Sequence, residues 1–362
     1  CKGCTVFDVS PYPARVLGKR RRGFRTLISG TAAAALVTSG LAVAVATAPA
    51  AHATNESVGI WLTTTSDSGG RNVTRGLQQQ TPISFSAGGG SGGQVVTVDE
   101  NTRYQRFTGA GASFTDTAAW LINSSGALSS GTRNTLMTNL FSPTSGIGLD
   151  FLRNPMGASD LARYSYTYDD MPSGQTDPSL AHFSISHDLA DVLPLTKQAR
   201  TLNPDLKVMG TPWTAPPWMK DSGAYSQGWL QSQYYAAYAQ YFVKYIQAYQ
   251  AQGLPIDFVS AQNEPTCCSG YPSMQWNGSG LDYFTATDLL PALHAAGLST
   301  KVLALDWNPD TYASYGAPTV DDATVRNDAD FGGVAFHGYR GSRTTPTRPH
   351  HQNPSPPTPH HQ

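Results

Sequence analysis

Short apolar runs alternate with longer helical stretches along most of this 362-residue chain. The runs are rich in β-branched and aromatic residues, as strands are. Strands that alternate with helices are typical of βα units around a parallel sheet, so we predict an α/β fold. The six runs lie at residues 104–111, 148–156, 206–212, 256–263, 301–307 and 331–339.

Two α/β architectures compete for this pattern. A doubly wound dinucleotide-binding sheet would open a helix with a glycine-rich fingerprint, and none of the helical stretches has one. Consecutive strand-then-helix units fit a (β/α)8 TIM barrel better. We predict that residues 99–339 form such a barrel, with only about six βα units present.

The clearest helical stretch spans residues 231–252. Aromatic residues recur in it at spacings of three and four, which places them on one face of a helix. Such a face packs against a sheet, so we interpret these rings as core and not as a ligand site. They are Tyr234, Tyr238, Tyr241, Phe242, Tyr245 and Tyr249.

We predict that the first 53 residues combine an upstream extension with an export signal peptide. Residues 19–22 are basic, residues 26–50 are uncharged and apolar, and residues 51–53 fit a small-x-small cleavage site. Arg21 and Arg22 also fit a twin-arginine address, so the Sec and twin-arginine routes both stay open. No later run is long enough for a membrane-spanning helix. We expect a secreted protein without a stable membrane anchor.

The charge that remains after removal of this segment excludes some partners. The segment contains seven of the 24 basic residues and one of the 25 acidic residues, which leaves 17 basic against 24 acidic. An acidic chain without a basic stripe is a poor match for nucleic acid or an anionic membrane. A neutral substrate fits better.

Residues 54–98 differ from the barrel region. They are rich in Thr, Ser, Gly and Gln and contain short β-type runs, which predicts a small accessory domain of strands and a linker. The two cysteines after residue 53, Cys267 and Cys268, are adjacent, and a vicinal disulfide and two free thiols both stay open. A metal site would need more ligands at suitable spacing, so we predict no metal and no cofactor.

Polar or aromatic side chains stand at the end of each predicted strand, where a TIM barrel carries its chemistry. Glu264 is the most informative, since it ends an apolar run and only two other glutamates occur in the chain. Carboxylates and amides bind hydroxyl groups, while indole and phenol rings stack on sugar faces, so a hydroxyl-rich ligand is indicated. The strand-end residues are Asp116, Arg153, Asp160, Trp213, Trp218, Asn263, Glu264, Asp306, Trp307, His337 and Tyr339.

Six sequence blocks in order carry a family resemblance. They are YQRFTGAGASFTDTAAWL, GIGLDFLRNPMGASD with YSYTYDD, VMGTPWTAPPWMK, FVSAQNEP with SGYPSMQW, VLALDWN and VAFHGY. Together they resemble glycoside hydrolase family 30, the glucosylceramidase-like and endo-β-1,6-glycanase-like retaining β-glycosidases. The resemblance runs from about residue 94 to residue 339.

The resemblance implies roles for individual residues. Glu264 would be the general acid/base, and Asn263 would hydrogen-bond the sugar 2-hydroxyl. Arg153 would orient the catalytic carboxylates, although Arg153 and His337 are also open to a purely structural role in the core. The substrate-binding residues that the resemblance implies are Asn263, Asp160, Trp213, Arg153, Tyr271, His337 and Tyr339.

A retaining mechanism also needs a nucleophilic carboxylate about 5 Å from the acid/base. The family supplies a glutamate at the end of the seventh strand, beyond the His337 block, and this chain has no acidic residue after Asp330. We therefore expect the nucleophile to be absent from this chain and the chain as given to be inactive.

Residues 340–362 have six prolines, four histidines and no aliphatic or aromatic side chain, so they form no strand or barrel helix. We favour an out-of-frame translation of a gene whose intact form continues the barrel. A natural linker on a non-catalytic carbohydrate-binding remnant and a His-rich metal-binding tail are the alternatives.

The function we expect is a secreted glycosidase acting on β-glucosides. The substrate is open between a glucosylceramide-like glycolipid of sphingolipid metabolism and a β-1,6-linked glycan. A carbohydrate-binding protein without turnover and a purely structural secreted protein are the competing functions.

Overall fold

A computed structural model describes residues 5–6, 57–66, 72–84, 99, 101–102, 107–266 and 270–341. The chain divides into two compact units, one of residues 15–103 and one of residues 1–14 and 104–362. Most of the predicted export segment, both adjacent cysteines and the tail after residue 341 lie outside the described residues. In the part of the chain that the structure describes, none of the helices combines the length and the hydrophobicity of a membrane-spanning segment.

The described part of the unit of residues 15–103 consists of two antiparallel strand pairs. Strand β2 (Ser57–Val58) pairs with β5 (Ile83–Ser84), and β3 (Trp61–Thr65) pairs with β4 (Val73–Gln79). These strands lie within residues 54–98, where the sequence predicts accessory strands.

The larger unit contains a sheet of six parallel strands in chain order, with β1 (Thr5–Val6) added antiparallel to the last of them. Neighbouring strands are neighbours in sequence, and helices lie between them. This is the topology of a partial (β/α) barrel, so the predicted fold class is confirmed. The six strands are β6 (Gly111–Ala112), β7 (Phe151–Met156), β8 (Lys207–Pro212), β9 (Phe258–Ser260), β10 (Lys301–Trp307) and β11 (Phe331–Phe336).

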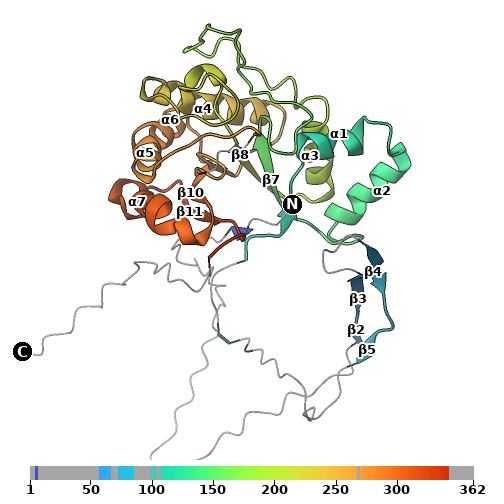
Figure 1. Cartoon of the computed structure of the whole chain (residues 1–362). Helices are drawn as coiled ribbons and strands as arrows, with labels where there is room; N and C mark the ends of the chain where they lie inside the picture. The colour runs from blue at the N-terminus through green and yellow to red at the C-terminus, as the bar shows by residue number, and fades with distance from the viewer. Residues whose placement is uncertain are drawn as a thin grey trace, which may run out of the picture. The chain divides into compact units, whose positions relative to one another are not determined.

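The helices lie around the outside of the strands (Figure 1). Polar caps mark where several begin: Thr115 accepts from the Ala118 N–H at the start of α1, and Ser129 and Asn277 cap α2 and α5 in the same way. The α-helices are α1 (Asp116–Asn123), α2 (Ser130–Phe141), α3 (Val192–Leu202), α4 (Tyr235–Ala251), α5 (Gly278–Phe284), α6 (Leu290–Ala295), α7 (Ala317–Asp321) and α8 (Ala323–Arg326). Short 3-10 or π turns lie at Pro217–Met219, Ser232–Tyr234, Thr285–Leu289, Pro309–Thr311 and Tyr312–Gly316.

The core has an outer and an inner part. The aromatic face of α4 belongs to the outer part, where Tyr238, Tyr241 and Tyr245 are completely buried, as the aromatic spacing predicts. The inner part is a smaller cluster to which five neighbouring strands contribute side chains, in the manner of a barrel interior. It consists of Phe151, Met209, Leu303 and Ala335, with Phe258 packed against them.

Some strands are shorter than predicted at their functional end. The run 256–263 yields only β9, which ends at Ser260, and Glu264 in the loop beyond it takes a left-handed backbone with φ of 50°. The run 331–339 likewise gives a strand that ends at Phe336. Asn263, Glu264, His337 and Tyr339 therefore lie on the loops just beyond the strands.

Candidate active site

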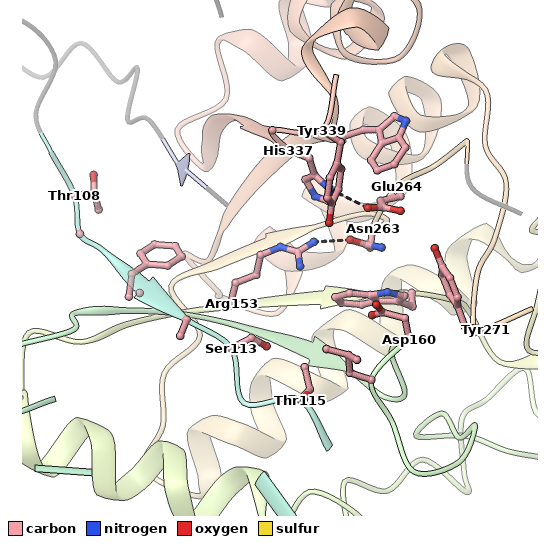
Figure 2. A pocket seen from close by; sticks show the side chains of 18 residues that line it. Thr108, Ser113, Thr115, Arg153, Asp160, Asn263, Glu264, Tyr271, His337 and Tyr339 are labelled. Carbon is pink, nitrogen blue, oxygen red and sulfur yellow. Dashed lines mark hydrogen bonds and ion pairs between the residues drawn. The ribbon is translucent and has the colours of Figure 1, made fainter. Parts of the chain in front are cut away.

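A cavity of about 640 Å³ opens at the C-terminal ends of the strands. Figure 2 shows its side chains converging from different strands and from the loops that follow them. Its size suits a ligand of one or a few sugar rings. The lining residues are Thr108, Gly109, Gly111, Ala112, Ser113, Thr115, Phe151, Arg153, Asp160, Leu161, Trp213, Asn263, Glu264, Tyr271, Trp307, His337, Gly338 and Tyr339.

The structure brings together all eight residues that the sequence predicts for the site. They reach one cavity because parallel strands in a barrel end at the same rim. Their individual roles in binding and catalysis stay predictions. Arg153 comes from β7, Asp160 from the loop after β7, Trp213 from the end of β8, Asn263, Glu264 and Tyr271 from the loop after β9, and His337 and Tyr339 from the loop after β11.

Arg153 ties the ends of three strands together. Its Nη2 donates to Asn263 Oδ1 and to Asp306 Oδ2, both at 2.8 Å, and its guanidinium lies 5.0 Å from the centre of the Trp213 ring. With Oδ1 held by Arg153, the Asn263 side chain turns its NH2 group toward the remaining space. The amide thus becomes a hydrogen-bond donor for a ligand.

His337 stands between two carboxylates. Its Nδ1 lies 3.1 Å from Glu264 Oε1 and its Nε2 lies 2.9 Å from Asp306 Oδ1. Ser260 on β9 donates a further hydrogen bond to Asp306 Oδ2. The imidazole therefore fixes the position of the Glu264 carboxylate from one side of the cavity (Figure 2).

Two pKa values in this network depart from their usual range. Burial alone would raise the pKa of Asp306, but the Arg153 charge and the hydrogen bonds from His337 and Ser260 outweigh it and hold that pKa well below normal. Burial would lower the pKa of His337, but contacts with Asp306 and Glu264 outweigh burial and raise it. A charged Asp306 beside a readily protonated imidazole follows from these shifts.

The backbone at this end of the barrel adopts unusual conformations. Glu264, Leu305 and Asp306 have φ of 50°, 70° and 51°, a region that residues other than glycine rarely occupy. The Glu264 N–H donates to the Asp306 carbonyl at 3.1 Å, which joins two of these positions. Such strain concentrates at functional sites, where surrounding structure maintains it.

Among the described residues, the lining offers two carboxylates to a ligand, Asp160 and Glu264. Asp160 is exposed, and the Glu264 side chain is 12 % exposed. Asp306 is close to Glu264 through the shared His337, but its side chain is fully buried, so it does not contact a ligand in the cavity.

The strand-end pattern includes Asp306 but does not predict its role, which its contacts with Arg153 and His337 establish. Asp116 does not line the cavity, because it begins α1 and pairs with Arg163 at 2.7 Å and with His187 at 2.8 Å. Ser260 on β9 also hydrogen-bonds Asp306, and no sequence pattern predicts this contact.

One group of side chains outside the cavity has metal-ligand chemistry. One ligand atom each from His294, Asp328 and Asp330 lie within 4.8 Å of one another. His294 contacts both carboxylates, and Lys301 contacts Asp330 at 2.8 Å. Lys301 pairs with Asp330, and the His294 imidazole already contacts both carboxylates, so these contacts account for the group without a metal ion.

Known proteins similar to this chain are glycoside hydrolases by their descriptions. A family model described as the glycosyl hydrolase family 30 TIM-barrel domain matches residues 107–357, past residue 339 where the sequence blocks end. An endo-1,6-β-D-glucanase of Neurospora crassa is 36 % identical over 255 residues, which are 68 % of this chain and 51 % of that protein. The putative glucosylceramidase 1 of Caenorhabditis elegans is 31 % identical over 266 residues, 69 % of this chain and 48 % of that protein.

Solved structures agree with the fold. The endo-β1,6-glucanase BT3312 superposes with a TM-score of 0.64 at 30 % identity and covers 75 % of this chain and 59 % of its own. SrfJ from Salmonella typhimurium gives a TM-score of 0.65 at 25 % identity, with 73 % and 57 % covered. The chain spans about half the length of the curated relatives it matches.

Proposed function

The chain belongs to glycosyl hydrolase family 30, and from that premise we propose that its cavity binds a glucose residue of a β-1,6-linked glucan, with Glu264 as the general acid/base of a retaining β-glycosidase. The observation that carries the proposal is the position of Glu264. Its carboxylate lines the cavity while His337 holds it from behind.

In this mechanism, Glu264 gives its proton to the glycosidic oxygen as the bond to the anomeric carbon breaks. It then takes a proton from the water that releases the sugar. The Asn263 NH2 group, oriented by Arg153, donates to the 2-hydroxyl and stabilises the oxocarbenium-like transition state. Trp213 and Asp160 bind the ring and its other hydroxyls.

A retaining mechanism needs a second carboxylate as nucleophile. Among the described lining residues the carboxylates are Glu264 and Asp160, and with Asp160 assigned to the sugar hydroxyls none is left for that role. We propose that turnover requires this second acid and that the chain binds sugar without hydrolysing it. A carbohydrate-binding remnant would behave in the same way, so sugar binding and glycoside hydrolysis must both be measured.

The β-1,6-glucan is favoured by the three relatives named endo-1,6-β-D-glucanases, which are 34 to 36 % identical to this chain. A glucosylceramide-type glycolipid is the second candidate, supported by the relatives named putative glucosylceramidases 1 and 2, both 31 % identical. Both substrates present a β-linked glucose to the cavity.

Calorimetry with β-1,6-gluco-oligosaccharides and with glucosylceramide in detergent tests the binding. We expect oligosaccharide binding by the wild-type chain and by Glu264→Gln, and hydrolysis by neither.

Added azide should attack the anomeric carbon of 2,4-dinitrophenyl β-glucoside, displace dinitrophenolate and yield α-glucosyl azide with inversion. Hydrolysis without an added nucleophile would contradict the proposal that the chain lacks the nucleophilic carboxylate. Failure to bind any β-glucoside would overturn the proposed function as a whole.

We further propose export, on the basis of the basic and apolar pattern within residues 1–53. Expression in a bacterial host should yield a protein whose N-terminus follows Ala53. Replacement of Arg21 and Arg22 by lysine should block export only if the twin-arginine route is used. Retention of an uncleaved chain inside the cell would contradict export.

A further inference from the structure

Two loops beside the cavity are fastened to each other along their length. The loop after β8 and the loop after β9 form a bridge between Trp229 and Gln275. Gln275 N donates to the Gly228 carbonyl at 2.8 Å, and Ser273 N donates to the Tyr225 carbonyl at 3.0 Å. We call residues 220–230 together with residues 270–276 the paired loops.

A buried lysine holds the paired loops from inside. Lys220 is only 2 % exposed, and its Nζ donates to the carbonyls of Tyr225, Gln227 and Ser273 at 3.1, 2.8 and 3.0 Å. An ammonium group has three donors, and all three find an acceptor here. Burial lowers the pKa of Lys220 to about 7. Because a buried amino group without hydrogen-bond partners is costly, the three contacts indicate a loop pair with one preferred shape.

Trp229 is exposed on this rigid framework. Its side chain is 43 % exposed, although its backbone is fixed on both sides: its N–H donates to Asp221 Oδ1 at 2.7 Å and its carbonyl accepts from Asp221 N at 3.0 Å. A large aromatic ring held out to solvent by an ordered backbone loses little entropy when it binds a ligand. Indole faces suit the apolar faces of sugars.

The paired loops also reach the cavity. Tyr271, four residues before Gln275, lines it, and four residues span at most about 15 Å. On the other side, Trp276 N donates to the Pro265 carbonyl at 2.9 Å, directly after Glu264. The paired loops therefore connect Trp229 with the cavity lining at Tyr271 and with the chain directly after Glu264.

From this arrangement we propose that Trp229 is an outer binding platform for glucose residues of a β-glucan chain beyond the residue in the cavity, and that Lys220 is a positioning residue for the platform. The proposal rests on the proposed function and deepens it. It makes the site one for oligosaccharides, in which affinity rises with chain length.

The test measures the affinity of β-1,6-gluco-oligosaccharides of one to four residues by calorimetry. Trp229→Ala should weaken binding of the tetrasaccharide about tenfold or more, a loss of about 1.4 kcal/mol, and leave methyl β-glucoside binding unchanged. Trp229→Tyr should retain part of the tetrasaccharide affinity that Trp229→Ala loses. Tyr283→Ala, which removes an aromatic residue 59 % exposed on α5, is the matched control and should change neither.

Lys220→Met tests the positioning role. We expect faster amide exchange in residues 225–229 and 271–275, together with weaker tetrasaccharide binding. Equal affinity of wild type and Trp229→Ala at every length would overturn the inference while the proposed function stands. No binding by the wild-type chain at any length would overturn both.

Discussion

Asp306 and His337 form a contact of 2.9 Å, and the opposite ring nitrogen of His337 faces Glu264. The Asp306 carboxylate is completely buried and also accepts from Arg153, which in turn holds Asn263. One hidden acid thus positions both residues that we expect to contact the reacting sugar. The contacts of Asp306 with Arg153 and His337 offset the cost of burying its charge in the barrel interior.

Asp306→Asn should damage both the fold and the proposed acid/base. Loss of this charge leaves Arg153 without its buried partner, so the free energy of unfolding should fall by about 3 to 5 kcal/mol. The pKa of His337 should also fall, because Asp306 stabilises the imidazolium. Denaturant unfolding and NMR titration of the labelled imidazole measure the two effects.

Ser260→Ala provides the control, since it removes one hydrogen bond to Asp306 and leaves the charge in place. We expect a loss of about 1 kcal/mol and little change in the His337 titration. An unchanged His337 pKa in Asp306→Asn would show that Asp306 does not set the protonation of the imidazole.

His337→Gln should reveal a pH-dependent part of the stability. The folded state raises the pKa of His337 above its usual value near 6.5, so its contribution is complete below that value and is lost as the pH rises through the folded pKa. The difference in melting temperature between wild type and variant should therefore be larger at pH 6 than at pH 9. A difference that is the same at both pH values would contradict this assignment.

The sequence predicts the order of the strands and the rim of the site better than the strand bounds, for a physical reason. In a parallel barrel the end of every strand reaches the same rim, so residues such as Arg153 and His337 meet although they are far apart in the chain. The positions of Asn263 and Glu264 follow from the same rule.

Other parts of the site are not visible in sequence. A strand-end acid can face the cavity or the core, and Asp306 faces the core beside a left-handed turn that only the folded chain establishes. The pairing of Lys220 with the Ser273 carbonyl depends on contacts between loops, which have no periodic pattern. Asp116 belongs to a helix start, which the strand-end rule does not distinguish.

Asp116→Asn should lower stability at neutral pH and much less in acid. Burial would raise the pKa of Asp116, but hydrogen bonds from Arg163 and His187 outweigh it and lower the pKa to about 2. This contribution is present above the unfolded value of 3.8 and is lost as the pH falls to about 2. Urea unfolding should show a loss of about 2 kcal/mol at pH 7. A loss of equal size at pH 2 would contradict the ion-pair role.

Gly111→Ala should prevent the first barrel strand from pairing. A Cβ at this position would lie 1.4 Å from the Phe151 carbonyl oxygen, and that oxygen belongs to the backbone of β7, which cannot move aside without breaking the sheet. Gly131→Ala, in α2, is the matched control: the nearest atom to its Cβ is Ser129 Oγ at 3.9 Å, and alanine favours helix by up to about 1 kcal/mol. Thermal melts should show no cooperative transition for Gly111→Ala and an equal or higher melting temperature for Gly131→Ala. A wild-type melt for Gly111→Ala would mean that β6 does not pack against β7 in solution, and the part of the cavity lined by Gly111 and Ala112 would then have to be rebuilt without that pairing.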